Sequence, residues 1–344
     1  MYPVIDGAKC TDCGKCVRTC PVVNNARPKS IAVGYAAYNT DEKQLKESSS
    51  GGVFSVLAEH LLNKGGVVFG AVYGDGLKVV HQKITTKEDL ALARGSKYMQ
   101  SVKGAIYKDV KAQLEKGSYV LFTGCPCEVA GLVAYLGKPY ERLLTADLIC
   151  HGVPPYKVFN SFLSEKKFYS SVNNVAFRDK SVGWGSSVIR YDLAGGRTET
   201  EPYADCAFIK GFIGNSYLRR SCYDCSFKGV DRASDLTIAD LWGARELVKG
   251  ENKGGMSLVV AHTDKGNVLL QYLGENGRLN LQEIDVGKAF AHNDSAVQSM
   301  PLTAKRKRYF RAAKKHGFSF SLSYSMKSSF FKKAKRKLKS WFKK

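Results

Sequence analysis

The stretch Tyr119-Val-Leu-Phe-Thr-Gly-Cys-Pro-Cys127 carries the signal that decides the fold. Residues 119–123 form a short apolar run, which is typical of a buried strand, and the run ends at Gly124. A helix is expected directly behind the cysteines, over 128–136. A strand followed by a turn and a helix is the repeating unit of an α/β fold, in which the carboxyl ends of neighbouring strands converge on one crevice.

The same alternation continues on both sides of this stretch. Strand patterns occur at 31–39, 67–73, 79–84 and 143–150, and helical spacing occurs at 54–62, 87–94 and 105–116. Beyond residue 172 the pattern changes to short strands at 175–178, 186–193, 236–239, 256–262 and 278–284, with a helix at 265–273. We therefore predict an α/β first half and an α+β second half that packs on it.

Charge is distributed unevenly along the 344 residues. The formal net charge is +22, and residues 301–344 contain 16 Lys or Arg and no Asp or Glu. The start lacks a signal-peptide pattern, and no run approaches the ~18 apolar residues of a membrane span. We therefore expect a cytoplasmic protein, in which cysteines are more often metal ligands or redox groups than disulfides.

The first cysteine run is Cys10-x2-Cys13-x2-Cys16-x3-Cys20-Pro21. This spacing is that of bacterial ferredoxins, in which three cysteines of a tight loop bind one 4Fe–4S cluster and the fourth binds the other cluster. Zinc sites more often pair two Cys-x2-Cys units across a longer gap. Because the chain has one run, Cys20 either completes its own cluster, or a distant cysteine such as Cys206 does, or half of the motif is missing.

Six further cysteines follow: Cys125, Cys127, Cys150, Cys206, Cys222 and Cys225. Cys127 and Cys150 each come just after a predicted strand, and Cys222 and Cys225 form a tight pair. Their thiolates could meet at the carboxyl ends of the strands and hold a second cluster. The alternative is that Cys127 and Cys150 are small buried apolar residues.

Two glycine-containing loops could bind a phosphate. Ser48-Ser-Ser-Gly-Gly52 precedes a predicted helix, whose free N–H groups would attract an anion, and Arg94-Gly-Ser-Lys-Tyr98 adds two cations and a ring. The alternative is a helix cap and a turn. The sequence contains no Gly-x-Gly-x-x-Gly fingerprint, so a flavin site would be of another type.

Taken together, the motifs resemble the coenzyme F420 hydrogenase/dehydrogenase beta-subunit family of flavin and iron–sulfur oxidoreductases. The segments that carry the resemblance are SSSGGVF at 48–54, RGSKYMQS at 94–101, GCPCEVAGL at 124–132, DLICHGVP at 147–154, SCYDCSFK at 221–228 and SDLTIADLWG at 234–243. They occur in order and span most of the chain before the basic end. The chain is most similar to members found with bacterial surface-polysaccharide biosynthesis.

The resemblance implies a mixed-sheet domain that binds FAD and a 4Fe–4S cluster, preceded by a half-ferredoxin segment with a cluster of its own. It assigns the family's cluster ligands to Cys127, Cys150, Cys222 and Cys225, and leaves Cys125 as a spare thiol. The flavin-contacting residues would be Ser49, Ser50, Gly51, Gly52, Arg94, Gly95, Ser96, Lys97, Tyr98 and Gln100. Lys97 would place positive charge near the flavin or its diphosphate.

Lys97 and His151 are the candidate catalytic residues. His151 follows Cys150 and could relay a proton, although a histidine in such a place more often only hydrogen-bonds locally. Trp184 could stack on a ligand or pack. Asp240 follows a predicted strand and could face a cofactor or cap a turn.

The end of the chain reads as a basic amphipathic helix. Apolar residues recur at helical spacing from Met326 to Phe342, with Lys and Arg between them. Such a helix fits an anionic membrane surface, while a solvated tail and nucleic-acid binding are the alternatives. We expect a peripheral position on the inner face of the cell membrane and do not expect a nucleic-acid partner.

Three segments are therefore expected: a ferredoxin-like segment at 1–30, a flavin and iron–sulfur domain at 31–300 and a basic helical tail at 301–344. The expected function is an oxidoreductase that passes electrons between one or two 4Fe–4S clusters and FAD, with a redox partner protein as donor or acceptor. Two alternatives are an electron-transfer subunit without its own substrate and a zinc-stabilised binding module without enzymatic activity.

Overall fold

An eight-stranded mixed sheet forms the centre of the computed structural model, which describes residues 4–24, 28–250 and 252–327. The strand order is β11-β1-β10-β9-β5-β4-β2-β3. Four neighbouring strands run parallel: β2 (Val67–Tyr73), β4 (Val120–Gly124), β5 (Leu143–Leu148) and β9 (Leu236–Asp240). The carboxyl ends of these four strands therefore lie along one edge of the sheet.

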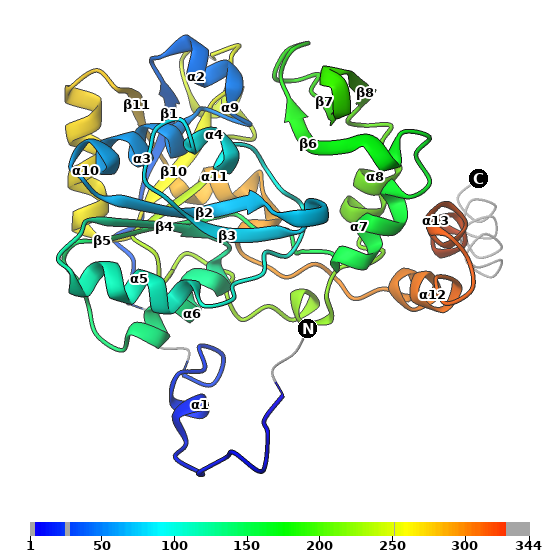
Figure 1. Ribbon diagram of the computed structural model, residues 1–344. Coiled ribbons are helices and arrows are strands. Elements are labelled where there is room, and N and C mark those ends of the chain that lie inside the picture. Colours follow the sequence, from blue (N-terminus) through cyan, green and yellow to red (C-terminus); the bar gives the residue numbers. More distant parts are fainter. Residues whose placement is uncertain (1–3, 25–27, 251, 328–344) are drawn as a thin grey trace, which may run out of the picture.

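Helices cover both faces of this sheet (Figure 1). Side chains alternate along β4, so Leu121 belongs to the apolar core that includes α3 (Val53–Asn63) and α10 (Asp264–Glu275), whereas Val120 and Phe122 belong to the core that includes α5 (Ile106–Glu115) and α6 (Pro126–Leu136). Both faces of β4 are thus buried, which is why its sequence is continuously apolar.

The second half of the chain extends this sheet. β10 (Ser257–Ala261) pairs antiparallel with both β9 and β1 (Val33–Asn39), and β11 (Leu279–Ile284) pairs with β1 at the edge. β3 (Val79–Ile84) closes the opposite edge. The mixed α/β class expected from the sequence is confirmed, with the strands beyond residue 235 built into the first sheet rather than packed against it.

A smaller antiparallel sheet lies beside the large one. It consists of β6 (Val172–Asp179), β7 (Val188–Leu193) and β8 (Thr198–Pro202). A largely aromatic core joins it to α7 (Tyr156–Leu163), α8 (Ala207–Ile213), α12 (Ala304–Ala312) and α13 (Phe318–Met326). Tyr309 and Phe318 are each 1% exposed, so α12 and α13 belong to this packed unit; most of the basic helix expected near the end of the chain lies outside the described residues.

Short helices complete the architecture. α2 (Glu42–Glu47) precedes the loop that leads into α3, and α4 (Leu90–Ala93) follows β3. α9 (Ala244–Leu247) and α11 (Val286–Ala291) pack near Leu258 and Val260 of β10. Between residues 4–24 the chain forms a projecting loop with α1 (Lys15–Arg18), visible at the bottom of Figure 1.

A buried ion pair lies where β5 meets β9. Arg232 and Asp147 each have 1% of their side-chain surface exposed, and Arg232 Nη1 lies 3.5 Å from Asp147 Oδ2. Thr237 donates a hydrogen bond of 2.5 Å to the other carboxylate oxygen of Asp147. Arg232 also donates to the carbonyl oxygens of Gly229 and Ala296, at 2.8 and 3.1 Å. The pair therefore ties the loop before β9 to the centre of the sheet.

The anchor of the N-terminal segment continues this network. Thr237 Oγ1 lies 2.8 Å from His262 Nε2, and His262 Nδ1 lies 2.7 Å from Ser30 Oγ. Burial lowers the pKa of His262 to about 3, so the imidazole is neutral and can donate at one nitrogen and accept at the other. The backbone N–H of Ser30 donates to Asp231. Ser30 therefore fixes the root of the projecting segment to the sheet.

Within the described ranges, no helix is long and apolar enough to cross a membrane.

Candidate functional site

Five thiols gather beyond the carboxyl ends of β4 and β5. The turn after β4 carries Cys125 and Cys127, and the turn after β5 carries Cys150. The Sγ atoms of Cys125 and Cys150 lie 3.8 Å apart. Cys222 and Cys225 come from the turn at η4 (Arg220–Tyr223), about seventy residues further along the chain than Cys150. Three segments that are distant in sequence thus place their cysteines in one region.

The electrostatics of the thiols show that they are mutual neighbours. Burial raises the pKa of Cys127, and the carboxylate of Glu128, followed by the thiols of Cys150, Cys225 and Cys222, raises it further. Burial likewise raises the pKa of Cys222 to about 11, with contributions from Cys150 and Cys225. The hydrogen bond between Cys125 and Cys150 raises the pKa of the Cys125 thiol and lowers that of Cys150, which Lys228 also lowers. Several thiols gathered in this way are suited to an iron–sulfur cluster, which binds thiolates.

The local structure explains how Cys127 is presented. Pro126 occupies the first turn of α6, where its missing N–H costs nothing, so the helix begins two residues earlier than expected. Glu128 Oε2 accepts a hydrogen bond of 2.9 Å from the backbone N–H of Cys125, and its other oxygen pairs with Lys103 Nζ at 2.5 Å. Cys127 therefore lies in the first turn of a capped helix, where the helix dipole favours a thiolate.

The turn after β5 approaches η4 closely. A side chain at Gly152 would place its Cβ 3.1 Å from Cys222 Cβ and 2.9 Å from Leu218, and Gly152 has a φ of +138°. Only glycine suits this combination. Lys228 reinforces the contact, because its ammonium donates to the carbonyl oxygens of Cys150 and Ser295. The sequence alone did not indicate this role of Lys228. Its position three residues after Cys225 was the feature that could have pointed to it.

The remaining cysteines lie elsewhere. Cys10, Cys13 and Cys16 are exposed on the projecting segment, and Cys20 is half-buried there. Cys206 is fully buried among the aromatic side chains of the small-sheet core, where burial raises its pKa to about 11. The suggestion that Cys206 completes the N-terminal cluster is therefore wrong. In the described part of the chain, no three His, Cys, Asp or Glu side chains are arranged to hold a single metal ion.

The two loops proposed to bind a flavin lie against each other. Ser49 Oγ accepts a hydrogen bond of 2.9 Å from the backbone N–H of Ser96. Lys180 donates hydrogen bonds to the carbonyl oxygens of Leu45, Ser50 and Gly254, at 2.5, 2.8 and 2.7 Å. These bonds hold the loop at 48–52 in place. The two loops proposed to bind a phosphate thus lie together. No pattern in the sequence indicated that Lys180 would hold one of them in place.

The serine-glycine loop packs on the large sheet. Gly51 donates to Ser257 Oγ at 3.0 Å, and Ser50 donates to the carbonyl oxygen of Met256 at 2.8 Å. Gly52 has a φ of +76° at the start of α3. The structure thus gives Gly51 and Gly52 conformational and packing roles in addition to any contact with a ligand.

Gly51→Ala is expected to destabilise the fold. The new Cβ would lie 2.6 Å from the backbone nitrogen of Ser257, so β10 or the loop must shift. Overpacking of this kind costs about 1–3 kcal/mol in the free energy of unfolding, measured by urea denaturation. Gly185→Ala is the control, because nothing lies within 4 Å of its Cβ and about 0.5 kcal/mol or less is expected. Equal stabilities of the two variants would contradict the close packing of Gly51.

The cations of the second loop differ in their surroundings. Arg94 is committed to structure: it donates to Ser55 Oγ at 3.0 Å and pairs with Glu47 at 2.8 Å. Lys97 Nζ donates to the carbonyl oxygen of Arg94 at 2.9 Å and lies 5.6 Å from the centre of the Tyr73 ring, with no carboxylate partner among the described residues. Burial lowers the pKa of Lys97 to about 8. Of the two cations of this loop, Lys97 is therefore the one that could pair with an anionic ligand.

The end of this loop contacts the small sheet. The Tyr98 ring packs against Phe177 and Phe212 at centroid distances of 5.2 and 5.1 Å, and Gln100 is half-buried. Arg178 of β6 forms an ion pair of 2.8 Å with Asp240. Asp240, for which the sequence suggested a cofactor contact or a turn cap, thus has an arginine partner. The Trp184 ring lies against Gly255, and its buried indole N–H has no hydrogen-bond partner in the described structure. The loops thus meet where the two sheets adjoin.

His151 is held by its neighbours. Its Nε2 lies 3.2 Å from the carbonyl oxygen of Phe212, and its Nδ1 lies 3.4 Å from Ser295 Oγ. Burial lowers its pKa. The imidazole is thus neutral and locally hydrogen-bonded, while its chain neighbour Cys150 belongs to the thiol group.

The sequence matches two parts of one protein family. Residues 34–105 match the N-terminal part of "Coenzyme F420 hydrogenase/dehydrogenase, beta subunit", and residues 117–286 match the C-terminal part of the same family. Residues 2–52 match a 4Fe-4S dicluster domain. The chain belongs to the coenzyme F420 hydrogenase/dehydrogenase beta-subunit family.

Two relatives of this beta-subunit family member are informative. The coenzyme F420-dependent sulfite reductase of Methanocaldococcus jannaschii is 31% identical over 280 residues, which cover 79% of this chain and 42% of that protein. This chain thus corresponds to less than half of that enzyme. A chain in the xenon-derivatised structure of the F420-reducing [NiFe] hydrogenase complex from Methanosarcina barkeri has a TM-score of 0.52 at 18% identity, covering 84% of this chain and 96% of that chain. The latter shows the same fold.

The family ranges divide the candidate residues in a consistent way. The N-terminal family range contains both proposed flavin loops, and the C-terminal range contains Cys127, Cys150, Cys222 and Cys225. The dicluster range contains Cys10, Cys13, Cys16 and Cys20 as its cysteines. α12 and α13 lie beyond residue 286, so the beta-subunit family match says nothing of them.

Proposed function

We propose that this chain is a flavin-dependent iron–sulfur oxidoreductase that passes electrons between 4Fe–4S clusters and FAD to a substrate. The observation that carries the proposal is the gathering of Cys125, Cys127, Cys150, Cys222 and Cys225 from three distant segments. The relatives support it, since one is a sulfite reductase and the other belongs to a hydrogenase complex. A zinc-stabilised binding module has no comparable support.

The chemistry of the thiol group fits a 4Fe–4S cluster. Such a cluster is bound by four thiolates and supplies one-electron transfer. Cys127, Cys150, Cys222 and Cys225 would hold it, with Cys125 beside them, and the cationic Lys228 next to Cys150 would offset part of the negative charge. Hydrogen bonds and charges near the sulfur atoms are among the factors that set the potential of a cluster. Cys10, Cys13, Cys16 and Cys20 would hold a second cluster on the projecting segment.

FAD would lie against the loops at 48–52 and 94–100, where Lys97 would face its anionic part. The coenzyme F420 in the names of both relatives is the first hydride donor or acceptor to assay. A role in surface-polysaccharide biosynthesis rests on the sequence resemblance alone. An electron-transfer subunit without its own substrate remains the second candidate, because the chain spans 42% of the sulfite reductase that it resembles.

The basic end of the chain is proposed to bind an anionic membrane surface. Residues 328–344 contain eight Lys or Arg and no Asp or Glu. Each cation near such a surface contributes on the order of 1 kcal/mol. The protein would then act in the cytoplasm, attached peripherally to the inner membrane face, and co-sedimentation with vesicles of anionic lipid tests this.

Anaerobic purification followed by iron, sulfide, zinc and flavin analysis tests the main proposal. About eight irons and about one FAD per chain are expected, with broad absorbance near ~400 nm. About four irons would leave one of the two proposed cluster sites empty. A colourless chain loaded with zinc and free of flavin would overturn the redox proposal in favour of the binding module.

Lys97→Gln is expected to weaken FAD binding by about tenfold, because a hydrogen bond to a charged group contributes about 1.5–3 kcal/mol. The native affinity should fall as the pH rises through about 8, where Lys97 loses its proton, and the bound anion should move this midpoint upward. The variant should lack that pH dependence. Lys87→Gln, an exposed lysine, is the control. Identical pH profiles of native chain and Lys97 variant, measured by flavin fluorescence titration, would exclude the role.

A further inference from the structure

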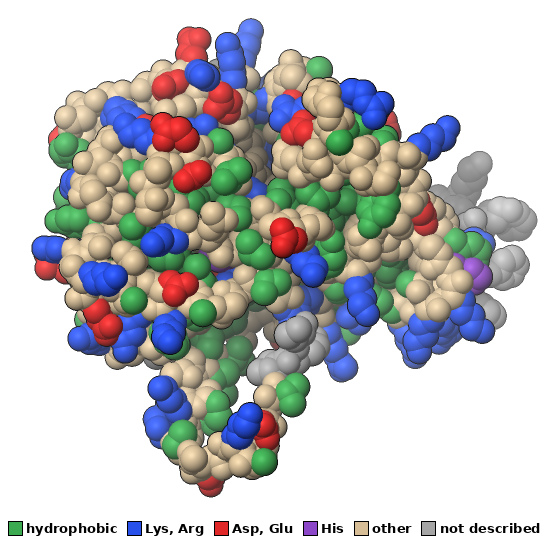
Figure 2. Space-filling model, viewed as in Figure 1, with side chains coloured by type: hydrophobic (Ala, Val, Ile, Leu, Met, Phe, Trp, Pro, Cys, Tyr) green, Lys and Arg blue, Asp and Glu red, His purple; other side chains and the backbone are tan. Residues whose placement is uncertain are grey.

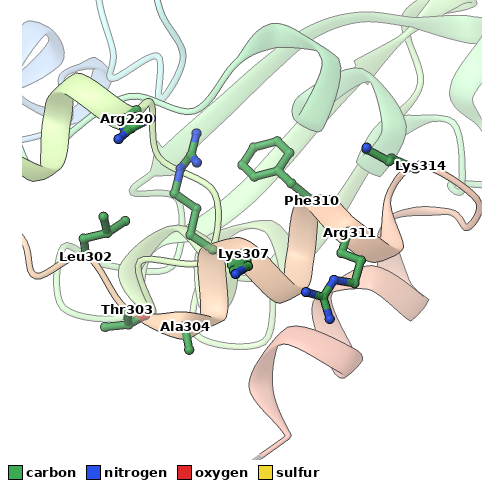
Figure 3. A pocket seen from close by; sticks show the side chains of 9 residues that line it. Arg220, Leu302, Thr303, Ala304, Lys307, Phe310, Arg311 and Lys314 are labelled. Carbon is green, nitrogen blue, oxygen red and sulfur yellow. The ribbon is translucent and has the colours of Figure 1, made fainter.

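A hollow of about 550 Å³ lies between α12 and the turn that carries Cys222. Five cations line it: Arg220, Arg306, Lys307, Arg311 and Lys314. We call this feature the basic groove. Figure 3 shows Lys307, Phe310 and Arg311 on α12, with Lys314 beyond its end and Arg220 on the facing turn. Figure 2 shows several Lys and Arg side chains at the lower right of the molecule, where α12 lies in Figure 1.

The charge of the basic groove is uncompensated. No Asp or Glu lines it, and none of its five cations forms an ion pair with a carboxylate in the part of the chain that the structure describes. Arg306 is held in place by a hydrogen bond of 2.9 Å to the carbonyl oxygen of Leu218, and its guanidinium lies 4.6 Å from the Phe310 ring. Five like charges repel one another, so an anionic partner would be attracted strongly.

Apolar surface accompanies the cations. Leu302 is 59% exposed at one side of the groove, and Phe310 is half-buried between cations. A single bound anion needs no such surface. Exposed leucine and phenylalanine side chains with arginine beside them are instead found in protein–protein interfaces, in which the apolar part contributes affinity and the surrounding charges steer association. This combination favours a protein partner with an acidic surface.

The groove adjoins the candidate cluster site. Arg220 is two residues from Cys222 on η4, and the Arg306 guanidinium lies 5.8 Å from the ring of Tyr223, the next residue. A partner in the groove would therefore contact the turn that supplies a proposed cluster ligand. We propose that the basic groove docks an acidic electron-carrier protein that exchanges one electron at a time with the centre at Cys127, Cys150, Cys222 and Cys225. The inference rests on the proposed function and adds the partner and its docking surface.

The test is stopped-flow reduction of the full, cluster-loaded chain by an acidic two-cluster ferredoxin that has been reduced and freed of excess reductant. Each transfer oxidises one ferredoxin cluster and reduces one cluster of the chain by one electron. The test variant carries Lys307→Glu, Arg311→Glu and Lys314→Glu. Its second-order rate constant should fall at least about tenfold, and the decrease of the native rate with added salt should be lost.

A matched control separates local docking from net charge. It carries Lys83→Glu, Lys87→Glu and Lys108→Glu, three exposed lysines near β3 and α5, well away from α12 in Figure 1. The control should keep the native rate, and all three proteins should have equal iron contents and equal rates of reduction by dithionite. An unchanged rate in the groove variant, or an equal loss in the control, would overturn the proposal.

Two further outcomes are decisive. If the groove variant loses binding to vesicles of anionic lipid while its reaction with ferredoxin is unchanged, the groove is a lipid surface and the carrier proposal is wrong. If the native chain holds no iron, the proposed function fails, and docking is then measured as binding of the ferredoxin to the immobilised full chain. Absence of salt-sensitive binding in that assay would overturn the docking proposal independently.

Discussion

Cys222→Ala is expected to remove about four irons from each chain and leave the other cluster in place. The thiol of Cys222 is a neighbour of those of Cys150, Cys127 and Cys225, and removing it would leave one iron of a cluster that is bound through four thiolates without its ligand. The loss is measured as iron and acid-labile sulfide per chain after anaerobic purification. Retention of all irons would disprove the assignment of Cys222 as a ligand.

The fifth thiol provides the sharpest control for this experiment. The resemblance assigns Cys127 as a ligand and Cys125 as a spare thiol, although the Sγ atom of Cys125 lies 3.8 Å from that of Cys150. Cys127→Ala should therefore lose the same irons as Cys222→Ala, whereas Cys125→Ala should retain them. The reverse result would exchange the roles of the two cysteines. Circular dichroism of each variant shows that iron loss does not reflect loss of the fold.

Arg232→Met is expected to destabilise the protein by about 3–5 kcal/mol, because it leaves the buried carboxylate of Asp147 without its cation. Both side chains are 1% exposed. Urea denaturation of the native chain and the variant measures the difference. The double variant Arg232→Met with Asp147→Asn should recover part of the loss, since it buries no unpaired charge. Lys210→Met removes an exposed ion pair with Asp205 and should cost less than about 1 kcal/mol.

The pH dependence of this effect has a definite sign. Burial raises the pKa of Asp147 above its ordinary value, and Arg232 opposes that rise. Without Arg232 the pKa rises further, so the folded variant binds a proton over a wider range than the unfolded chain does. Its stability therefore falls as the pH rises through that range. Its deficit relative to the native chain shrinks as the pH falls from the raised pKa of Asp147 in the variant toward the lower pKa of Asp147 in the native chain, and is constant at more acidic pH. A deficit that grows at acidic pH would contradict the ion pair.

Helices and strands whose apolar residues form a clear local pattern were predictable from the sequence. β2 and β3 have the predicted bounds, because each is a single apolar or alternating run that ends at a glycine or polar turn. α8 and β8 were missed: α8 is a short helix buried among aromatic side chains, and the exposed β8 has no buried face to produce alternation. Their structure depends on the small sheet, which no local pattern encodes.

The candidate site shows the same division. The sequence places Cys127 and Cys150 after strands, and the structure places both turns at one edge of the sheet, as parallel pairing requires. The approach of Cys222 depends on Gly152 and Lys228, and the basic groove depends on Arg220 meeting α12, some eighty residues away in the chain. These are tertiary contacts between segments that are distant in sequence, so the spacing of residues along the chain could not reveal them. The ligand and flavin assignments stay predictions until the iron and flavin measurements are made.

The distance along the chain between the gathered cysteines sets an order for biogenesis. Cys10 to Cys20 occupy one short segment that precedes all the other cysteines in the chain, whereas Cys127 and Cys225 are separated by β5, the whole small sheet and α8. β9, which follows Cys225, must insert beside β5, and β10 must join β9 to β1 before the sheet is continuous. The inner thiols can therefore meet only after the small sheet and the strands around β9 have formed, and any cluster that they bind would be inserted after the one bound by Cys10 to Cys20. An assembly factor that acts early would find only the N-terminal cysteines ready.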